Sequence, residues 1–170
     1  MHKVDISIVI VNWKVRPLLE KCLDSIIADT ADFTTEIFVV DNDSRDGTPE
    51  MVMAQFPQVT MITLSSNNGF AKANNIALKQ AKGRYLFLLN PDTEVEMGFF
   101  KTIISYLDVH SEVGILGPRI LNSDHSLQQS IRRFPKLLSQ LLILFKIRNL
   151  VPKNKIFRSY FSKRFRKRSI

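Results

Sequence analysis

The feature that most constrains the fold is a regular alternation of strand-like runs and helix-like stretches over the first 120 residues. Each strand-like run is short, mostly apolar, and rich in β-branched or aromatic residues. This composition is typical of strands buried on both faces of a parallel sheet. The predicted strands are Ile6 to Val11, Glu36 to Val40, Val59 to Leu64, Tyr85 to Leu89 and Val113 to Leu116.

The stretches between these runs have helical periodicity. In the first of them, Leu18, Cys22 and Ile26 recur at intervals of four and form one apolar face. We interpret Gly83 as the left-handed residue that ends the third helix. The predicted helices are Pro17 to Ala28, Thr48 to Phe56, Ala71 to Ala81 and Gly98 to Leu107.

This order of elements predicts an α/β fold. Strands that alternate with helices form a doubly wound, mostly parallel sheet with right-handed crossovers. Ligands of such sheets bind at the carboxyl ends of the strands. The search for a site therefore begins where each predicted strand ends.

The distribution of charge divides the chain in two. The formal net charge is +8, but residues 132–170 hold 13 basic residues and no acidic ones, so residues 1–131 carry a net charge of about −5. Basic and apolar residues alternate along the end of the chain, as in an amphipathic helix. We predict a core of residues 1–131 and a basic, amphipathic helical extension of residues 132–170.

The basic extension has three interpretations. Its charge could increase solubility, bind nucleic acid, or dock on an anionic membrane leaflet. Nucleic acid is disfavoured because the acidic core would repel phosphates. The Leu-rich segment of residues 137–151 falls short of the ~20 apolar residues that span a bilayer. It can bury one apolar face at the surface, which favours peripheral docking on the inner face of the cell membrane.

The remaining composition is consistent with a cytoplasmic protein. Cys22 is the single cysteine, so neither an intramolecular disulfide nor a cysteine-based zinc cluster can form. Its place on an apolar helical face predicts a buried core residue. The N-terminus lacks the long apolar segment and cleavage site of a signal peptide.

Polar clusters follow three of the predicted strands. Asn12 and Trp13 follow the first strand, residues 41–48 the second, and residues 90–94 the fourth. A buried strand that ends in an acid holds a carboxylate rigidly at the edge of the sheet. No GxGxxG or GxxxxGK[ST] motif occurs, which argues against dehydrogenases and P-loop NTPases. Residues 67–75 open a helix with amides and a lysine, a pattern that weakly indicates anion binding.

Four of these segments together resemble the successive motifs of family 2 glycosyltransferases. They are Ser7 to Trp13, Val39 to Thr48, Asn67 to Phe70 with Asn74 and Asn75, and Leu88 to Thr93. The likeness covers residues 4 to about 160 and is strongest to the rhamnosyltransferase-like branch that builds bacterial surface polysaccharides. It implies a GT-A (Rossmann-like) fold, a dTDP- or UDP-linked sugar donor, and inverting transfer to a saccharide or lipid-linked acceptor.

The resemblance also implies roles for individual residues. Asp41 would accept a hydrogen bond from the ring N–H of the donor's pyrimidine, and Val11 and Asn12 would line the base and ribose. Asp92 would bind Mg²⁺ or Mn²⁺ bridging the donor diphosphate, because hard cations take carboxylate and phosphate oxygens. The residues expected to lie near the nucleotide are Asn67, Gly69 and Asn74.

Two departures from the family pattern bear on function. Asn90 stands where the family usually has a first aspartate, which leaves Asp92 as the one carboxylate for the cation. The sequence also ends before the Glu-Asp motif that supplies the catalytic base, and Glu94, Glu96 and Asp124 are weak substitutes. The catalytic residue is therefore unassigned. The alternative is a truncated or split module that binds a nucleotide sugar and needs a partner for the base.

Two smaller questions stay open on the sequence alone. Asp46 fits a structural turn before a helix better than a ligand, whereas Trp13 suits stacking on a base and packing at the sheet edge equally well. Asn74 and Asn75 are compatible both with donor contact and with a solvent-facing helix.

Overall fold

The computed structural model describes residues 4–128 of the chain. The chain divides into two units, Met1–His110 and Ser111–Ile170, and each is considered by itself. The predicted extension of residues 132–170 lies outside the described residues. The first unit contains every named strand and helix.

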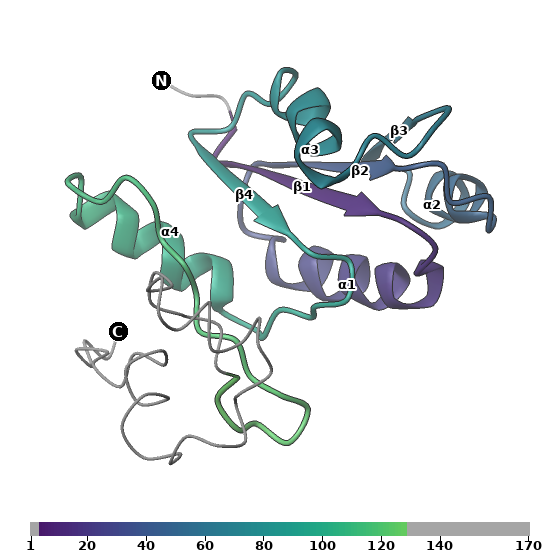
Figure 1. The fold of residues 1–170 in the computed structure, drawn as a ribbon. Coiled ribbons are helices and arrows are strands. Elements are labelled where there is room, and N and C mark those ends of the chain that lie inside the picture. Colours follow the sequence, from purple (N-terminus) through teal and green to yellow (C-terminus); the bar gives the residue numbers. More distant parts are fainter. Residues whose placement is uncertain (1–3, 129–170) are drawn as a thin grey trace, which may run out of the picture. The chain divides into compact units, whose positions relative to one another are not determined.

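The first unit is built on a four-stranded parallel sheet in the order β3-β2-β1-β4 (Figure 1). The strands are β1 (Ile6–Asn12), β2 (Thr35–Asp41), β3 (Val59–Thr63) and β4 (Tyr85–Leu89). These bounds confirm four of the five predicted strands and the α/β fold class. All seven residues of β1 are buried, because β1 pairs with both β2 and β4 and is covered on both faces.

Helices cover both faces of this sheet. They are α1 (Arg16–Asp29), α2 (Thr48–Gln55), α3 (Phe70–Leu78) and α4 (Phe99–Val109), as predicted to within a few residues. Figure 1 shows α3 on one side of the strands and α1 on the other. The core beneath α3 consists of Val9, Val11, Phe38, Val40, Ala73 and Ala77.

On the opposite face, aromatic rings join β4 to α4. The rings of Phe87 and Phe100 meet edge to face at a centroid distance of 5.5 Å, a favourable geometry for aromatic pairs. The start of α4 is held by the carboxylate of Asp29, which accepts a hydrogen bond from the backbone N–H of Phe100 at 2.8 Å. A carboxylate at this position also interacts favourably with the helix dipole.

The interpretation of Gly83 as a left-handed helix end is wrong. Its φ is not among the positive values of the chain, and α3 ends at Leu78. Gly83 instead lies against β1, where its N–H donates to the hydroxyl of Ser7 at 2.7 Å. A Cβ at this position would lie 2.7 Å from the carbonyl carbon of Ile6. Glycine is needed here because two backbones approach closely.

The predicted strand at Val113 to Leu116 is also wrong. These residues are neither strand nor helix, and the side chain of Ile115 is 95% exposed. An apolar run becomes a strand only where a second strand offers hydrogen-bond partners. In the described part of the second unit, the one backbone pairing of this kind is an antiparallel bridge between Leu121 and Leu127.

None of the helices within residues 4–128 is both long enough and apolar enough to cross a bilayer.

Candidate functional site

The order of the strands defines where a ligand would bind. The chain moves outward from β1 to β2 and β3, and then returns to place β4 on the other side of β1. The strand order therefore reverses at β1 and β4, and in open α/β sheets this switch point is the usual ligand crevice. Asn12 ends β1, Asp41 ends the neighbouring β2, and the loop that holds Asp92 follows β4. The polar clusters predicted to form a site thus lie together at the carboxyl ends of the strands.

Asn12 and Asp41 are buried next to each other at the carboxyl ends of β1 and β2. They are directly paired in the sheet register, and their side chains are 0% and 1% exposed respectively. The Nδ2 group of Asn12 donates to Oδ1 of Asp41 at 3.2 Å and lies 3.1 Å from the hydroxyl oxygens of Ser44 and Thr48. The other carboxylate oxygen of Asp41 accepts the N–H of Ser44 at 3.0 Å. These contacts hold the carboxylate in a fixed position.

The loop after β2 is compact and has an unusual backbone. Asp43 and Arg45 have positive φ values of 63° and 54°, and Gly47 has 78°. Left-handed conformations at non-glycine residues are uncommon, and they persist where surrounding contacts determine them. Arg45 and Asp43 form an ion pair with an N–O distance of 2.8 Å.

Asp46 has a structural role in this loop. Its Oδ1 accepts hydrogen bonds from the N–H of Thr48 at 3.1 Å and from the hydroxyl of Thr48 at 2.6 Å, at the start of α2. This is the turn and helix entry that the sequence favoured for Asp46.

A hollow of about 340 Å³ opens beside this loop at the ends of β2 and β3. Asp41, although nearly buried, is one of the residues that line it. The other lining residues are Asp43, Arg45, Gly47, Pro49, Glu50, Thr63 and Leu64.

Asn67 and Gly69 lie in the loop between β3 and α3. The Oδ1 of Asn67 accepts hydrogen bonds from Nδ2 of Asn42 and from the N–H of Gly69, both at 2.9 Å. The side chain of Asn67 thereby joins the loop after β2 to the loop after β3. Gly69 has a φ of 75°, and a Cβ there would meet no atom within 4 Å. The backbone at Gly69 is therefore open to a ligand.

Asn74 is buried, whereas its neighbour Asn75 is exposed. The Nδ2 of Asn74 donates to the carbonyl of Phe70 at 2.9 Å. Within the described residues, the Oδ1 atoms of Asn74 and Asn12 are buried without a hydrogen-bond partner. Buried polar atoms are nearly always hydrogen-bonded, so each oxygen is a candidate acceptor for a ligand or a water molecule.

Asp92 projects from a turn at the end of β4. The carbonyl of Asn90 accepts hydrogen bonds from the N–H and the hydroxyl of Thr93, at 3.3 Å and 2.7 Å, which closes the turn. Asp92 itself is exposed. Residues 4–128 contain no cluster of three or more His, Cys, Asp or Glu side chains that could hold a metal ion. A cation at Asp92 would thus need most of its ligands from the substrate and from water.

Val11 is buried directly before Asn12, while Trp13 directly after it is exposed. Sequence reasoning did not single out Ser44, Thr48 or Asn42 as site residues. Their positions within seven residues after Asp41 were the available signal, but their contacts with Asn12 and Asn67 become visible only in the folded chain. Among the weak candidates for a catalytic base, Glu94 and Glu96 are exposed. Asp124, in the second unit, accepts hydrogen bonds from Ser126, which lower its pKa.

The Sγ of Cys22 lies 3.7 Å from the carbonyl oxygen of Asn90, and we expect this thiol to be unreactive in the native protein. It is fully buried in α1, and burial raises its pKa to about 12. At pH 8 only about one thiol in 10⁴ would be ionised, and the thiolate is the reactive form. Reaction with an aromatic disulfide reagent should therefore be at least about 100-fold slower in native protein than in guanidinium chloride. Comparable rates in the two conditions would contradict the burial of this residue.

Comparisons with known proteins show which family and fold the chain is similar to. The model of the family "Glycosyl transferase family 2" matches residues 7–170. The minor teichoic acid biosynthesis protein GgaB of Bacillus subtilis is 28% identical over 117 residues, covering 66% of this chain and 13% of that protein. The N-acetylglucosaminyl-diphospho-decaprenol L-rhamnosyltransferase of Mycobacterium tuberculosis is 26% identical over 144 residues, covering 78% and 47%. The chain thus spans less than half the length of either relative.

Solved structures show the same fold. The S. aureus TarS fragment 1–349 in complex with UDP has a TM-score of 0.57 and 25% identity, covering 63% of this chain and 33% of that one. The mannosyltransferase PcManGT of Pyrobaculum calidifontis, in complex with GDP-Man and Mn²⁺, has a TM-score of 0.54 at 24% identity over the same shares. These likenesses confirm the expected GT-A fold. Because the family model matches residues 7–170, which is nearly the whole chain, the chain belongs to glycosyl transferase family 2.

Proposed function

We propose that the chain binds a nucleoside diphosphate sugar and transfers its glycosyl unit, with inversion, to a saccharide or lipid-linked acceptor in cell-surface polysaccharide synthesis. The observation that carries this proposal is that Asn12 and Ser44 hold the carboxylate of Asp41 in a fixed position, in a residue that lines an open hollow. Relatives that act in teichoic acid synthesis and rhamnosyl transfer support the same class of reaction.

The donor's base would bind against Asp41. Each carboxylate oxygen has two lone pairs and accepts one of the hydrogen bonds described above, so acceptor capacity remains for the ring N–H of uracil or thymine. The complex of TarS with UDP supports a donor of this type. Val11 and Asn12 would lie beside the base and ribose, and Asn67, Gly69 and Asn74 beside the rest of the nucleotide. The open backbone at Gly69 and the unpartnered oxygen of Asn74 support this arrangement.

Asp92 fits a divalent cation, Mg²⁺ or Mn²⁺. Its carboxylate is exposed, and these hard cations commonly bind one or two carboxylates together with substrate phosphates and water. When bound, such a cation neutralises negative charge on the leaving diphosphate. The role of this chain would be to present one carboxylate on a closed turn at the end of β4. Asn90 contributes its backbone carbonyl to that turn.

A second candidate function is a nucleotide-sugar-binding module that obtains its catalytic base from another polypeptide. It is favoured by the position of Glu94, which is exposed in the loop after β4, because a general base must be held within hydrogen-bond reach of the acceptor hydroxyl. Release of sugar from the donor by the 170-residue chain alone would reject this alternative.

We further propose that residues 1–131 form the nucleotide-sugar-binding core and that residues 132–170 form a basic amphipathic helix. The excess of basic residues in this extension would place the protein peripherally on the inner face of the cell membrane. That location suits a lipid-linked acceptor.

The experiment that tests the proposed function is calorimetric titration of UDP and dTDP in the presence of Mn²⁺. We expect Asp41→Ala to weaken binding roughly 10- to 100-fold, because a hydrogen bond to a charged group contributes about 1.5–3 kcal/mol. Asp92→Ala should abolish the dependence of affinity on Mn²⁺. Asp24→Ala, at an exposed position of α1, removes the same charge away from the site and should have little effect.

Circular dichroism of each variant separates loss of binding from loss of fold. Asp41→Asn is a second check that a loss of binding is not a loss of fold, because it keeps a hydrogen-bonding side chain in the buried network. Unchanged affinity in both Asp41→Ala and Asp92→Ala would refute the assignment of the site.

A further inference from the structure

One continuous part of the described chain has no acidic residue. Residues 51–91 contain four basic residues and no Asp or Glu, whereas residues 4–128 as a whole contain 10 basic and 16 acidic residues. Arg84 pairs with Asp108 at 2.7 Å, so its charge is compensated. No ion pair involves Lys72, Lys79 or Lys82 among the described residues, and all three are exposed.

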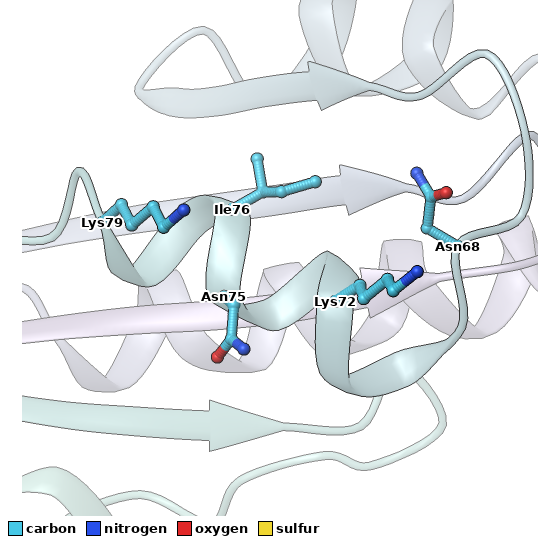
Figure 2. Close-up of a pocket in the computed structure, with 5 residues that line it drawn as sticks. All are labelled: Asn68, Lys72, Asn75, Ile76 and Lys79. Atoms are coloured by element: carbon cyan, nitrogen blue, oxygen red, sulfur yellow. The ribbon is translucent and has the colours of Figure 1, made fainter.

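Two of these lysines lie on the outer surface at α3, one within the helix and one directly after its last residue. Lys72 and Lys79 are seven residues apart and therefore share one side of the helix, while Ala73 and Ala77 face the sheet. Figure 2 shows both lysine side chains along the outside of the helix, with the strands behind it. The lysines border an open hollow of about 350 Å³, together with Asn68, Asn75 and Ile76.

Apolar side chains are exposed on the same side of the sheet. Leu86 and Leu88 of β4 pair in register with Ser7 and Val9 of β1. Partners in register point to the same face of a sheet, and Val9 belongs to the core beneath α3. Leu86 and Leu88 thus lie on the α3 side, yet they are 55% and 48% exposed. They are uncovered because α3 packs over β1 and β2, while β4 is at the edge of the sheet.

We propose that Lys72, Lys79, Leu86 and Leu88, which we call the α3 face, dock on the surface of an anionic lipid bilayer. Lysines are attracted to the anionic headgroups of a membrane, and large apolar side chains bury at the boundary with the acyl chains. A surface that combines both kinds of side chain therefore suits a membrane interface. Lysine is depleted at protein–protein interfaces, so this composition favours lipid over a protein partner.

The acidic residues elsewhere in the body do not prevent this orientation. Charges beyond about 8–10 Å are largely screened at physiological ionic strength, so the side facing the membrane dominates the interaction. The inference rests on the membrane association proposed above and adds a contact in the folded body to the one assigned to the extension. The N-terminus of α3 lies near the carboxyl ends of the strands, where the candidate site is (Figure 1).

The test is co-sedimentation of the full chain with vesicles of phosphatidylcholine alone and of phosphatidylcholine with one-third phosphatidylglycerol. Each lysine near an anionic surface contributes about fivefold to partitioning. Lys72→Gln/Lys79→Gln should therefore weaken partitioning to the anionic vesicles roughly 25-fold. The matched control is Lys21→Gln/Lys101→Gln, which removes the same charge from exposed positions of α1 and α4 on the other side of the sheet. It should change partitioning less than about twofold.

Leu86→Gln/Leu88→Gln should reduce partitioning to both kinds of vesicle, because it removes apolar area rather than charge. Three results would overturn the proposal: no binding of the unmodified chain to anionic vesicles, an equal loss in the two lysine double variants, or no loss in Lys72→Gln/Lys79→Gln. If the leucine variant instead changes the sedimentation coefficient without lipid, the α3 face contacts protein, which also overturns it. UDP titration of the same proteins keeps the proposals separate, since vesicle binding without UDP binding rejects only the proposed function.

Discussion

Replacing Gly83 with alanine is expected to lower the free energy of unfolding by about 3 kcal/mol. The added Cβ would lie 2.7 Å from the carbonyl carbon of Ile6 and closer still to the backbone nitrogen of Ser7. Both are backbone atoms of the central strand β1, which cannot move without disturbing its pairing with β2 and β4. The substitution would also disturb the hydrogen bonds that the Gly83 N–H donates to the Ser7 hydroxyl and the Glu36 carboxylate.

Thermal and urea unfolding followed by circular dichroism would measure this effect. A loss of that size is a large fraction of the 5–15 kcal/mol that stabilises a typical domain, and should lower Tm by roughly 10 °C. Gly114→Ala is the matched control, because a Cβ at Gly114 meets no atom within 4 Å. Equal stability of the two variants would show that β1 and Gly83 are not in close contact.

The second large effect is expected for Asn12→Asp. This change replaces the Nδ2 group that lies 3.2 Å from Oδ1 of Asp41 with a second carboxyl oxygen. Two adjacent buried carboxyl groups cannot readily both ionise, so the new acid would be protonated in the folded state and ionised in the unfolded state. Because the folded state then binds the extra proton, stability relative to the unmodified chain falls as pH rises above the usual carboxyl range.

We expect a loss of at least about 3 kcal/mol at pH 8 and a smaller loss at pH 5. Urea unfolding at the two pH values would measure it. Asn75→Asp makes the same chemical change at an exposed position of α3 and should alter stability by less than about 0.5 kcal/mol. A pH-independent effect of Asn12→Asp would indicate that the side chains of Asn12 and Asp41 do not meet in the folded protein.

Much of the candidate site was predictable because it lies at strand ends. Asn12 and Asp41 follow continuous apolar runs, so their positions at the edge of a parallel sheet could be inferred from the pattern alone. The hydrogen-bond partners of Asn12 could not be inferred from the sequence pattern. Asp41, Ser44 and Thr48 are 29, 32 and 36 residues away in the sequence, and no local pattern specifies which of many polar side chains will meet.

The sequence also left Asn74 and Asn75 equivalent. The structure separates them. Asn74 is buried, and its side-chain Oδ1 has no hydrogen-bond partner, whereas Asn75 is exposed beside Lys72 and Lys79. A helix turns by 100° per residue, so adjacent positions face different surroundings. Which of the two faces the sheet depends on where α3 packs, a question of tertiary structure.

The sequence by itself determined the identity of the strands in the first unit, because a nearly continuous apolar, β-branched run such as residues 6–11 of β1 is stable only when buried on both faces. It also determined that polar groups gather where these strands end. Tertiary structure decided the rest. It left Val113 to Leu116 unpaired despite a strand-like composition, gave Gly83 its role through the approach of β1, and exposed Leu86 and Leu88 by placing β4 at the edge of the sheet. Pairing, close approach and exposure depend on residues distant in the chain, and such contacts form only when the sheet assembles.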